Sequence, residues 1–451
     1  MTCTKSASGA DVTMSDLLEL KIVSLGSGGE GVAKLDSGKT VFIDSPVIPG
    51  EICSVRVLEE KSRFARGKCI EVLTPSPDRV ISFGEEIPGA NLAHMSYETQ
   101  LKYKYDKVRD CLSRIAGLDI TVDPIVPSAR NEHYRNHMQY SLQKGHFCLK
   151  SQGTDEDVVV TDSPLEYEMF GPVRDVLEKS FADHPTRLFG GAVLRGSERT
   201  GEILIELVSY SDMTSELVIR DASSYIGAAG LADKIPNVAG IVLRISNSAT
   251  EKRTRGGKRV VLYGRDHYNE VLCDLNYKVK AGAFFQVNVP QAETLYRLTA
   301  PSDGYGRLWD LYCGTGTVGL SLISPGHKLI GVDISPEAIA SARDNAMAAG
   351  VDAEFICKPA SKVLSLLNDI SPDDAVVVDP PRAGLDFALI GKLLEMTPSH
   401  ISYISCDPAT LARDLKHFAE AGYSVKRVMP VDMFPGTAHI ECVVQLHRVS
   451  I

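Results

Sequence analysis

The stretch that decides the fold is LWDLYCGTGTVGLSL, residues 308–322. Its apolar first half is typical of a buried strand, and its glycines are typical of a tight turn that opens a helix. Gly314 and Gly316 let the backbone approach a ligand closely, and the first helical turn leaves N–H groups free. Asp333 follows about 20 residues later, at the end of the next strand pattern, where a ribose-binding acid belongs. The spacing therefore predicts a nucleotide-binding turn.

Strand and helix patterns alternate regularly around this stretch, from residue 284 onward. The helix pattern SPEAIASARDNAMAAG is the clearest, with Ser335 as N-cap and Gly350 at its end. Alternation of this kind predicts a Rossmann-like α/β sheet with helices on both faces. The last two strands have only a short connection, which predicts antiparallel pairing. Seven strand candidates favour the fold of S-adenosylmethionine-dependent methyltransferases: RLWDLYC, KLIGVDI, AEFICK, AVVVDP, ISYISC, YSVKRVMPV and ECVVQLHRV.

Two other regions precede this domain. Residues 17–75 contain five short alternating runs separated by turn formers, which predicts a small β-barrel of the OB type, a common oligonucleotide binder. The pattern at 97–116 predicts an amphipathic helix ended by Gly117. Residues 126–280 are irregular and β-rich. We expect a central domain there, together with residues 76–96.

The composition predicts a cytoplasmic protein with no membrane span. Of the 451 residues, 44% are hydrophobic and 24% charged, and the N-terminus lacks the apolar core of a signal peptide. Ten scattered cysteines, without a C-x-x-C pair, do not suggest disulfides. The net charge of −10 argues mildly against a nucleic-acid partner, although the distribution of charge matters more than its sum.

Positive charge gathers at two places. The run KSRFARGK surrounds Phe64 and is a candidate RNA contact, although lysines and arginines that protect a solvated edge strand would look the same. The segment EKRTRGGKR, residues 251–259, predicts a basic hairpin tip, for which a solvated turn is the commoner explanation. The charged residues of the first run, on one face of a strand, are Lys61, Arg63, Arg66 and Lys68.

Cys406 stands in SCDPATLARDL, residues 405–415, where a strand ends and a helix begins. Asp407 is suited to cap that helix and Pro408 to occupy its first position. Most cysteines are buried and inert, but strand ends of this fold face the active cleft. A thiolate at a helix N-terminus is favoured by the helix dipole. We therefore predict that Cys406 is a nucleophile.

Two acids are expected in the same cleft. Asp379 ends the fourth strand in VVVDPPRAG, beside the nucleotide-binding turn, and Glu441 follows His439 between the last two strands. A uracil ring would explain why these groups occur together. Addition of a thiolate to carbon 6 makes carbon 5 nucleophilic towards a methyl sulfonium, and a base must then remove the proton from carbon 5. The target base would have to leave its stack to reach such a cleft.

These motifs resemble the RNA (uracil-5-)-methyltransferases that act on transfer and ribosomal RNA. FFQVN (284–288), DLYCGTG, GVD, DPPRAG, SCDPATLARD and DMFPGTAHIE occur in family order, and the N-terminal unit resembles a TRAM domain. The resemblance implies Cys406 as nucleophile, Glu441 as proton acceptor and S-adenosylmethionine as cofactor. It also implies that the helix at 97–116 packs on the catalytic domain, which would comprise 97–125 and 281–451. The implied cofactor-binding residues, besides the glycines, are Gln286, Tyr312, Thr317, Asp333 and Asp379, and further expected RNA contacts are Arg135, Asn136, Phe285 and Arg382.

The chain also departs from the family pattern. Many members carry four cysteines that bind an iron–sulfur cluster, but residues 80–101 contain no cysteine and a later ligand position is Ser163. We therefore predict no cluster and no metal site. Asp407 replaces a usual asparagine and would place an extra charge beside the thiol. Gly436 and His137 also differ from the common residues, which leaves the substrate's identity open.

Three alternatives stay open from the sequence. An RNA cytosine-5 methyltransferase usually needs a second cysteine, and DPPRAG contains none. An RNA-binding protein with an inactive catalytic domain would not need the intact Cys406, Glu441 and Asp379. A dehydrogenase would rest only on the glycine spacing. The sequence does not choose between transfer RNA and ribosomal RNA as the substrate, and a monomer is the expected state.

Overall fold

The computed structural model describes residues 17–448 except 45, 86, 119, 152–155, 211–214, 247–255, 302–303, 360–361 and 363–365. Most of the predicted basic hairpin tip at 251–259 therefore lies outside the described residues. The chain divides into two units. The first comprises residues 1–103, 151–155 and 436–438, and the second comprises 104–150, 156–435 and 439–451. In the described part of the chain, every helix is too short or too polar to cross a lipid bilayer.

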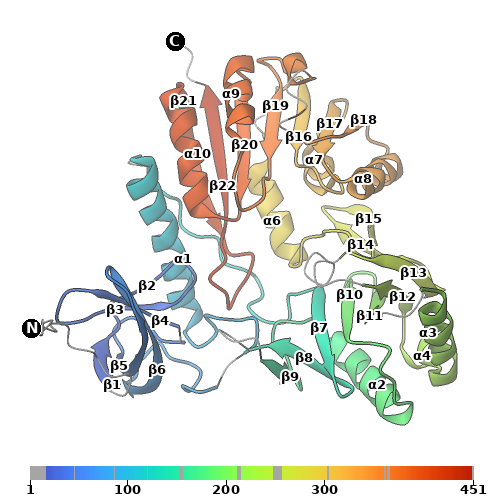
Figure 1. Ribbon diagram of the computed structural model, residues 1–451. Coiled ribbons are helices and arrows are strands. Elements are labelled where there is room, and N and C mark those ends of the chain that lie inside the picture. The colour runs from blue at the N-terminus through green and yellow to red at the C-terminus, as the bar shows by residue number, and fades with distance from the viewer. Residues whose placement is uncertain are drawn as a thin grey trace, which may run out of the picture. The chain divides into compact units, whose positions relative to one another are not determined.

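The first unit is built on a six-stranded sheet of order β1-β5-β6-β4-β3-β2 (Figure 1). Ala65, Gly67 and Cys69 of β6 face the core, whereas Arg66 and Lys68 alternate with them and are exposed. All neighbouring strands are antiparallel except β4 and β6. The bounds are β1 Leu17–Lys21, β2 Ser24–Leu25, β3 Gly31–Lys34, β4 Thr40–Ile43, β5 Ile52–Glu60 and β6 Phe64–Thr74. Each of the five predicted runs forms strand, which confirms the small β-barrel.

A buried ion pair fixes the segment that follows this sheet. The side chain of Glu51 is 0% exposed and that of Arg79 is 8% exposed. Glu51 accepts hydrogen bonds from Arg79 Nε at 2.7 Å and Arg79 Nη2 at 2.8 Å. It also accepts from the backbone N–H groups of Ile48 and Ser76. Burial alone would raise the pKa of Glu51, but these hydrogen bonds outweigh it and hold the pKa below its usual value.

Glu51→Ala is expected to lower the free energy of unfolding of the first unit by about 3–5 kcal/mol, because it leaves a buried guanidinium without its partner. Since the folded pKa of Glu51 is depressed, its stabilising contribution is present above pH ~4.5 and lost as the pH falls below that value. Urea unfolding at neutral and acidic pH measures both effects. Glu59→Ala, on the strand that directly follows Glu51, is the control, because Glu59 and Lys61 form an exposed pair. Equal losses in both variants would contradict the role of Glu51.

The central part of the second unit is a seven-stranded sheet of order β13-β12-β11-β10-β7-β8-β9. Helices α2 (Phe170–Asp183), α3 (Ser215–Ala229) and α4 (Leu231–Lys234) bury their apolar stripes against it. The sequence pattern indicates the strands of this region but not α2 and α3. The strands are β7 His137–Gln143, β8 His146–Lys150, β9 Asp157–Val159, β10 Gly191–Gly196, β11 Ile203–Ser209, β12 Val238–Ile245 and β13 Lys258–Gly264, and a hairpin follows with β14 His267–Leu272 and β15 Leu275–Lys280.

The catalytic sheet has the order β18-β17-β16-β19-β20-β22-β21. Its strands are parallel except β22, which runs antiparallel to both β20 and β21. The predicted antiparallel pair is therefore confirmed, with the last strand inserted one place inside the edge. The strands are β16 Arg307–Leu311, β17 Lys328–Asp333, β18 Ala353–Cys357, β19 Ala375–Val378, β20 His400–Ser405, β21 Tyr423–Val431 and β22 Glu441–Arg448.

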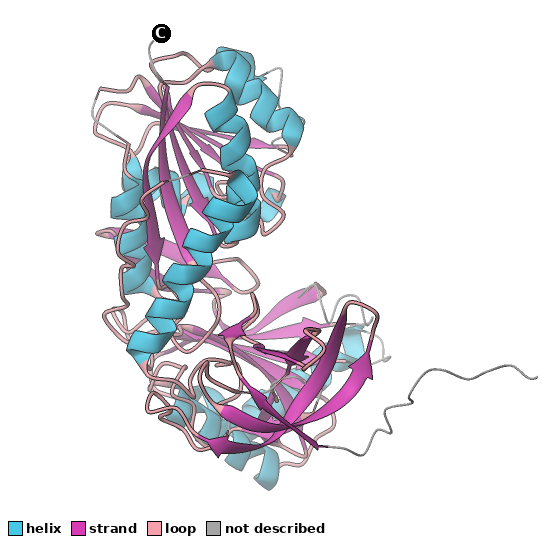
Figure 2. Ribbon diagram, turned by 90° about the vertical axis from the view of Figure 1, so that its left-hand side faces the viewer, coloured by secondary structure: helices cyan, strands magenta, loops and turns pink. Residues whose placement is uncertain are grey.

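Helices cover both faces of this sheet (Figure 2). On one face, α9 (Phe387–Met396) and α10 (Pro408–Glu420) pack with Val376, Val378, Ile401 and Tyr403. Val108, near the end of α1 (Tyr97–Cys111), joins the same cluster. The opposite face packs Ala375, Val377 and Ile404 against three helices. These are α6 Val289–Thr299, α7 Thr317–Leu322 and α8 Pro336–Ala349.

Candidate active site

The glycine-rich turn follows β16 as predicted. Gly314 and Gly316 have φ angles of 55° and 81°, which favour glycine. A Cβ atom at Gly314 would meet nothing within 4 Å, so the turn leaves open space for a ligand beside its backbone. Asp333, at the end of β17, accepts the Gly314 N–H at 2.9 Å and the Ser335 N–H at 2.8 Å. The carboxylate is thereby fixed beside the turn, and each oxygen keeps a second lone pair for a ribose hydroxyl.

Asp310 is a further acid at this place, which the sequence analysis did not single out. It is fully buried, and its Oδ2 accepts the Gly319 N–H of α7 at 2.8 Å. Its Oδ1 is buried and has no hydrogen-bond partner among the described residues. Burial and the nearby Asp379 and Asp333 raise the pKa of Asp310 to about 7. A ligand with an ammonium group would supply the missing donor.

These features fit S-adenosylmethionine, which carries an ammonium group, a ribose and an adenine. Asp310 can accept from the ammonium, Asp333 can accept from the ribose hydroxyls, and the side chain of Ile334 is 68% exposed and offers the adenine an apolar surface. Tyr312 adopts a φ of 72° directly before the turn. Thr317 begins α7, where its hydroxyl contacts Tyr296 at 3.2 Å. Gln286 lies in the segment before α6, with its carbonyl bonded to Asn136 at 2.9 Å.

The loop that carries Asp379 is tied to the helix that follows Cys406. Thr410 donates its hydroxyl to the carbonyl of Arg382 at 3.1 Å, and Arg413 donates to the carbonyls of Ala383 and Leu385. Asp407 caps α10 by accepting from the N–H groups of Ala409 and Thr410, at 2.9 and 3.0 Å. The predicted cap is therefore confirmed. These hydrogen bonds fix the loop after Asp379 against α10, the helix that follows Cys406.

Strand register brings Cys406 and Glu441 together. The ladder between β20 and β22 pairs Ser405 with Cys442. This pair ends the ladder, so Cys406, the next residue, and Glu441, the first residue of β22, lie beside the same pair, and Glu441 contributes to the raised pKa of the Cys406 thiol. Alternation along the strands also puts Asp379 and Asp310 on the sheet face that carries Ile404 and Val377. All four groups therefore lie at the same edge of the sheet, where β16, β19 and β20 end and the antiparallel β22 begins.

The electrostatics of this cluster differ from the expectation of a dipole-stabilised thiolate. Burial, followed by the charges of Glu441 and Asp379, raises the pKa of the Cys406 thiol to about 11, and Arg382 opposes the shift. Burial also raises the pKa of Asp379 to about 7. The pKa of Glu441 is raised well above its usual range by burial and by Asp379. Burial therefore favours the neutral, protonated forms of these three groups in the ligand-free site.

The predicted RNA contacts are partly accessible. Lys61, Arg63, Arg66 and Lys68 are exposed, although Arg66 forms an ion pair with Asp44 at 3.2 Å. Arg382 is exposed and donates a hydrogen bond to His439 at 3.2 Å. Arg135 is partly exposed.

Two of the predicted RNA contacts need correction. Asn136 is 1% exposed, and its amide joins the start of β7 to the carbonyl of Gln286. Phe285 is 5% exposed and packs on Tyr277 with ring centroids 6.0 Å apart. The neighbouring Phe284 is 69% exposed and is the accessible ring of the pair. In this structure, Asn136 and Phe285 therefore hold the segment before α6 in place, and Phe284 is the better candidate for an RNA contact.

Purified protein is expected to contain less than stoichiometric iron and acid-labile sulfide, because residues 80–101 lack cysteine. His94, the histidine of this stretch, is within hydrogen-bond distance of the carbonyl of Val47, at 3.2 Å. Among the described residues, no group of three or more histidine, cysteine or acidic side chains could hold a metal ion. Metal analysis and the visible absorption spectrum of anaerobically purified protein test the prediction. One cluster per chain would contradict it.

Comparisons with known proteins identify the family of this chain. The family model of tRNA (uracil-5-)-methyltransferases matches residues 250–449, and the TRAM domain model matches residues 16–70. A Bacillus cereus protein called an uncharacterized RNA methyltransferase is 33% identical, over 97% of this chain and 98% of the relative. A similar Clostridium tetani protein is 31% identical over 96% of both chains.

A similar solved structure contains the product form of the cofactor. The Pyrococcus abyssi tRNA (uracil-54, C5)-methyltransferase, in complex with S-adenosyl-L-homocysteine, has a TM-score of 0.76 and 26% identity to this chain. The match covers 95% of this chain and 100% of that one. S-adenosyl-L-homocysteine is what remains of S-adenosylmethionine after methyl transfer. The chain therefore belongs to the S-adenosylmethionine-dependent RNA (uracil-5-)-methyltransferase family.

Proposed function

We propose that this enzyme methylates carbon 5 of a specific uridine in structured RNA through a covalent bond between Cys406 and carbon 6. The observation that carries the proposal is the convergence of one thiol and two carboxyl groups. Cys406 directly follows Ser405 at the end of the β20–β22 ladder, Glu441 is the first residue of β22, and both acids act electrostatically on the thiol. A nucleophile and a base at this spacing are what addition and elimination on a pyrimidine require.

The reaction balances with these groups. Cys406 loses its proton and Sγ bonds to carbon 6, while the electron pair of the carbon 5–carbon 6 double bond moves towards oxygen 4. S-adenosylmethionine would supply an electrophilic methyl carbon to carbon 5, with cleavage of its sulfur–methyl bond and release of the neutral thioether S-adenosyl-L-homocysteine. Once carbon 5 carries the methyl group, Glu441 removes the remaining proton from carbon 5. The double bond re-forms, the bond between Sγ and carbon 6 breaks, and Cys406 leaves as thiolate.

The raised pKa values mean that the site must also remove the proton of Cys406 and favour the ionised forms of its groups. Cys406 must lose a proton to attack, and Asp379, with a pKa of about 7, can hold that proton or donate a hydrogen bond at the edge of the base. The positive charge of Arg382 partly offsets the rise in the pKa of both Cys406 and Glu441. This exposed cation therefore favours the two ionised forms that the reaction uses.

We further propose a uridine of transfer RNA or ribosomal RNA, flipped out of a loop, as the target. The family model and the Pyrococcus structure support transfer RNA as the first substrate to test. A cytosine target is less well supported, because the loop from Asp379 to Gly384 contains no second cysteine. We propose that the enzyme works in the cytoplasm as a monomer.

A tritium-methyl transfer assay tests the proposal. Unmodified transfer RNA and unmodified large-subunit ribosomal RNA are incubated separately with labelled S-adenosylmethionine, and the nucleosides are analysed. Label in 5-methyluridine from one RNA is the expected result and identifies the substrate. Label in 5-methylcytidine, or no label from protein that binds the cofactor, would contradict it.

A further inference from the structure

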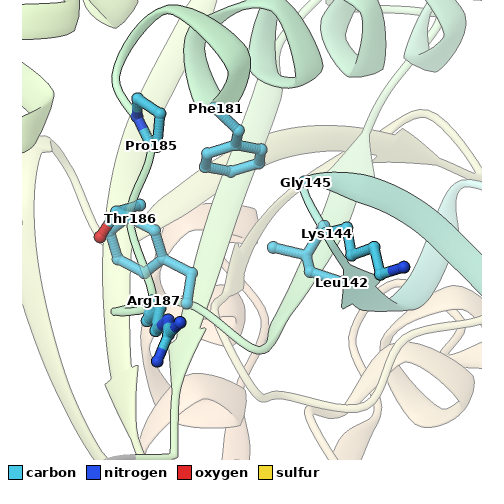
Figure 3. Close-up of a pocket in the computed structure, with 8 residues that line it drawn as sticks. Leu142, Lys144, Gly145, Phe181, Pro185, Thr186 and Arg187 are labelled. Atoms are coloured by element: carbon cyan, nitrogen blue, oxygen red, sulfur yellow. The ribbon is translucent and has the colours of Figure 1, made fainter.

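The central domain contains a pocket of about 580 Å³ that belongs to another part of the fold than the cysteine cluster (Figure 3). One wall is the two-residue turn Lys144–Gly145, between β7 and β8. The other wall is the connection from α2 to β10. The lining residues are Leu142, Lys144, Gly145, Phe181, Pro185, Thr186, Arg187 and Phe189.

The floor of the pocket is apolar and rigid. Phe181 and Phe189 are each 7% exposed, with ring centroids 6.1 Å apart. Tyr225 of α3 supports both rings, at 6.0 Å from Phe181 and 5.4 Å from Phe189. Leu142 extends towards the open space from the strand side. A flat, weakly polar group would therefore find a preformed surface.

The rim carries two cations on opposite sides, Lys144 and Arg187, and both are exposed (Figure 3). Neither has an ion-pair or hydrogen-bond partner among the residues that the structure describes. Glu178, a nearby acid, already pairs with His146 and accepts the Phe147 N–H. Two unneutralised cations over one hollow, in a chain of net charge −10, indicate an anionic occupant.

The local backbone and a hydroxyl add to this arrangement. Lys144 has a φ of 52° and Gly145 a φ of 88°, as in the tight hairpin turns whose two central residues both have positive φ. This conformation is uncommon for lysine. Thr186 accepts the Leu188 N–H at 3.1 Å, so its own hydroxyl hydrogen remains available to an acceptor. The rim thus offers a hydroxyl donor beside its two cations.

We propose that this pocket binds one unpaired nucleotide of the substrate RNA, outside the loop that contains the target uridine. The base would lie over Leu142 and the aromatic floor, and its phosphate would be bound by Lys144, Arg187 and Thr186. The volume lies within the ~300–1,000 Å³ range of small-ligand pockets. An unstacked base with its phosphate matches an apolar floor under a cationic rim. The inference rests on RNA as the substrate class and not on the covalent mechanism.

The test is equilibrium binding without turnover, in the presence of S-adenosyl-L-homocysteine. The probes are full-length unmodified transfer RNA, unmodified large-subunit ribosomal RNA, and isolated hairpins from the loops of each. In the double variant Lys144→Glu/Arg187→Glu, affinity for one full-length RNA is expected to fall about tenfold or more. The slope of log affinity against log salt is expected to fall by about one, because the contact to one phosphate is lost. Affinity for the isolated hairpin is expected to stay unchanged.

A matched control separates the pocket from general charge effects. Lys179→Glu/Arg220→Glu makes the same change of charge on exposed positions of α2 and α3. Thr186→Trp fills the pocket and leaves the charges in place, so it should weaken binding without changing the salt slope. Circular dichroism and thermal unfolding verify that each variant is folded.

Three kinds of result would contradict nucleotide binding in this pocket. Equal losses in the pocket variant and the control variant would overturn it, as would an equal loss for the hairpin. Unchanged RNA binding in the double variant and in Thr186→Trp would assign the pocket to another occupant, such as an acidic peptide. Failure of the unsubstituted protein to bind either full-length RNA would exclude RNA as the occupant. None of these results depends on whether methyl transfer is observed.

Discussion

Cys406→Ala is expected to reduce methyl transfer below about one thousandth of the rate of the unsubstituted enzyme, a loss of at least ~4 kcal/mol of transition-state stabilisation. Without Sγ, carbon 5 of the target base stays a poor nucleophile. The substitution removes one partly exposed atom at the end of β20 and leaves the Asp407 cap of α10 intact. Binding of S-adenosylmethionine is therefore expected to change little. Single-turnover kinetics and calorimetry measure the two quantities.

Cys357→Ala is the matched control for this experiment. Cys357 is an exposed thiol at the end of β18 on the same sheet, outside the cysteine and carboxyl cluster. Its replacement should leave the rate within about twofold. Turnover by Cys406→Ala near that of the unsubstituted enzyme would exclude the covalent mechanism. Loss of cofactor binding together with activity would instead indicate a structural role.

Glu441→Gln is expected to trap a covalent complex between protein and methylated RNA. Burial and Asp379 raise the pKa of Glu441 well above its usual range, which favours the neutral carboxyl in the ligand-free site. Glutamine copies that neutral group in size and charge, and RNA binding and addition of the thiol should proceed. It cannot remove the proton from carbon 5, so elimination should slow by at least ~100-fold. A slowly migrating species on a denaturing gel, labelled in the methyl group, measures the adduct.

The double variant Cys406→Ala/Glu441→Gln controls for non-specific cross-linking. It should give no slowly migrating species, because the thiol that forms the bond is absent. Full turnover by Glu441→Gln, with no adduct at any time, would remove Glu441 from the role of base. Adduct that persists in the double variant would show that another residue bonds to the RNA.

Much of the fold follows from local patterns in the sequence. The first unit alternates inward Ala65, Gly67 and Cys69 with outward Arg66 and Lys68, and this period of two identifies its longest strand. The helices of the central domain were missed, although α2 buries Phe170, Val173, Leu177 and Phe181 at helical spacing. That stripe is visible in the sequence. The surrounding β-rich runs favoured an interpretation as strands.

The site could be predicted as far as strand ends allow. Cys406, Asp379 and Asp333 each terminate a parallel strand, so the fold alone places them at one edge. Whether Phe284 or Phe285 faces outward depends on how the segment before α6 packs against Tyr277, and no local rule gives that. Asn136 has the polarity of an RNA contact but serves two backbone segments. The importance of Asp310 appears only when its unpaired oxygen is seen beneath the turn.

The antiparallel register of β20 and β22 limits where residues can be inserted or deleted as these proteins evolve. The ladder of backbone hydrogen bonds between these strands ends at Ser405 and Cys442, so the spacing of the neighbouring Cys406 and Glu441 depends on this ladder more than on the length of any loop. Connections elsewhere can therefore lengthen or shorten over evolution while the chemistry keeps its spacing. A single residue inserted within either strand would instead turn its active group to the opposite face of the sheet. Inserted residues should therefore be tolerated least within β20 and β22. Neither strand contains a glycine or proline that would mark this constraint in the sequence.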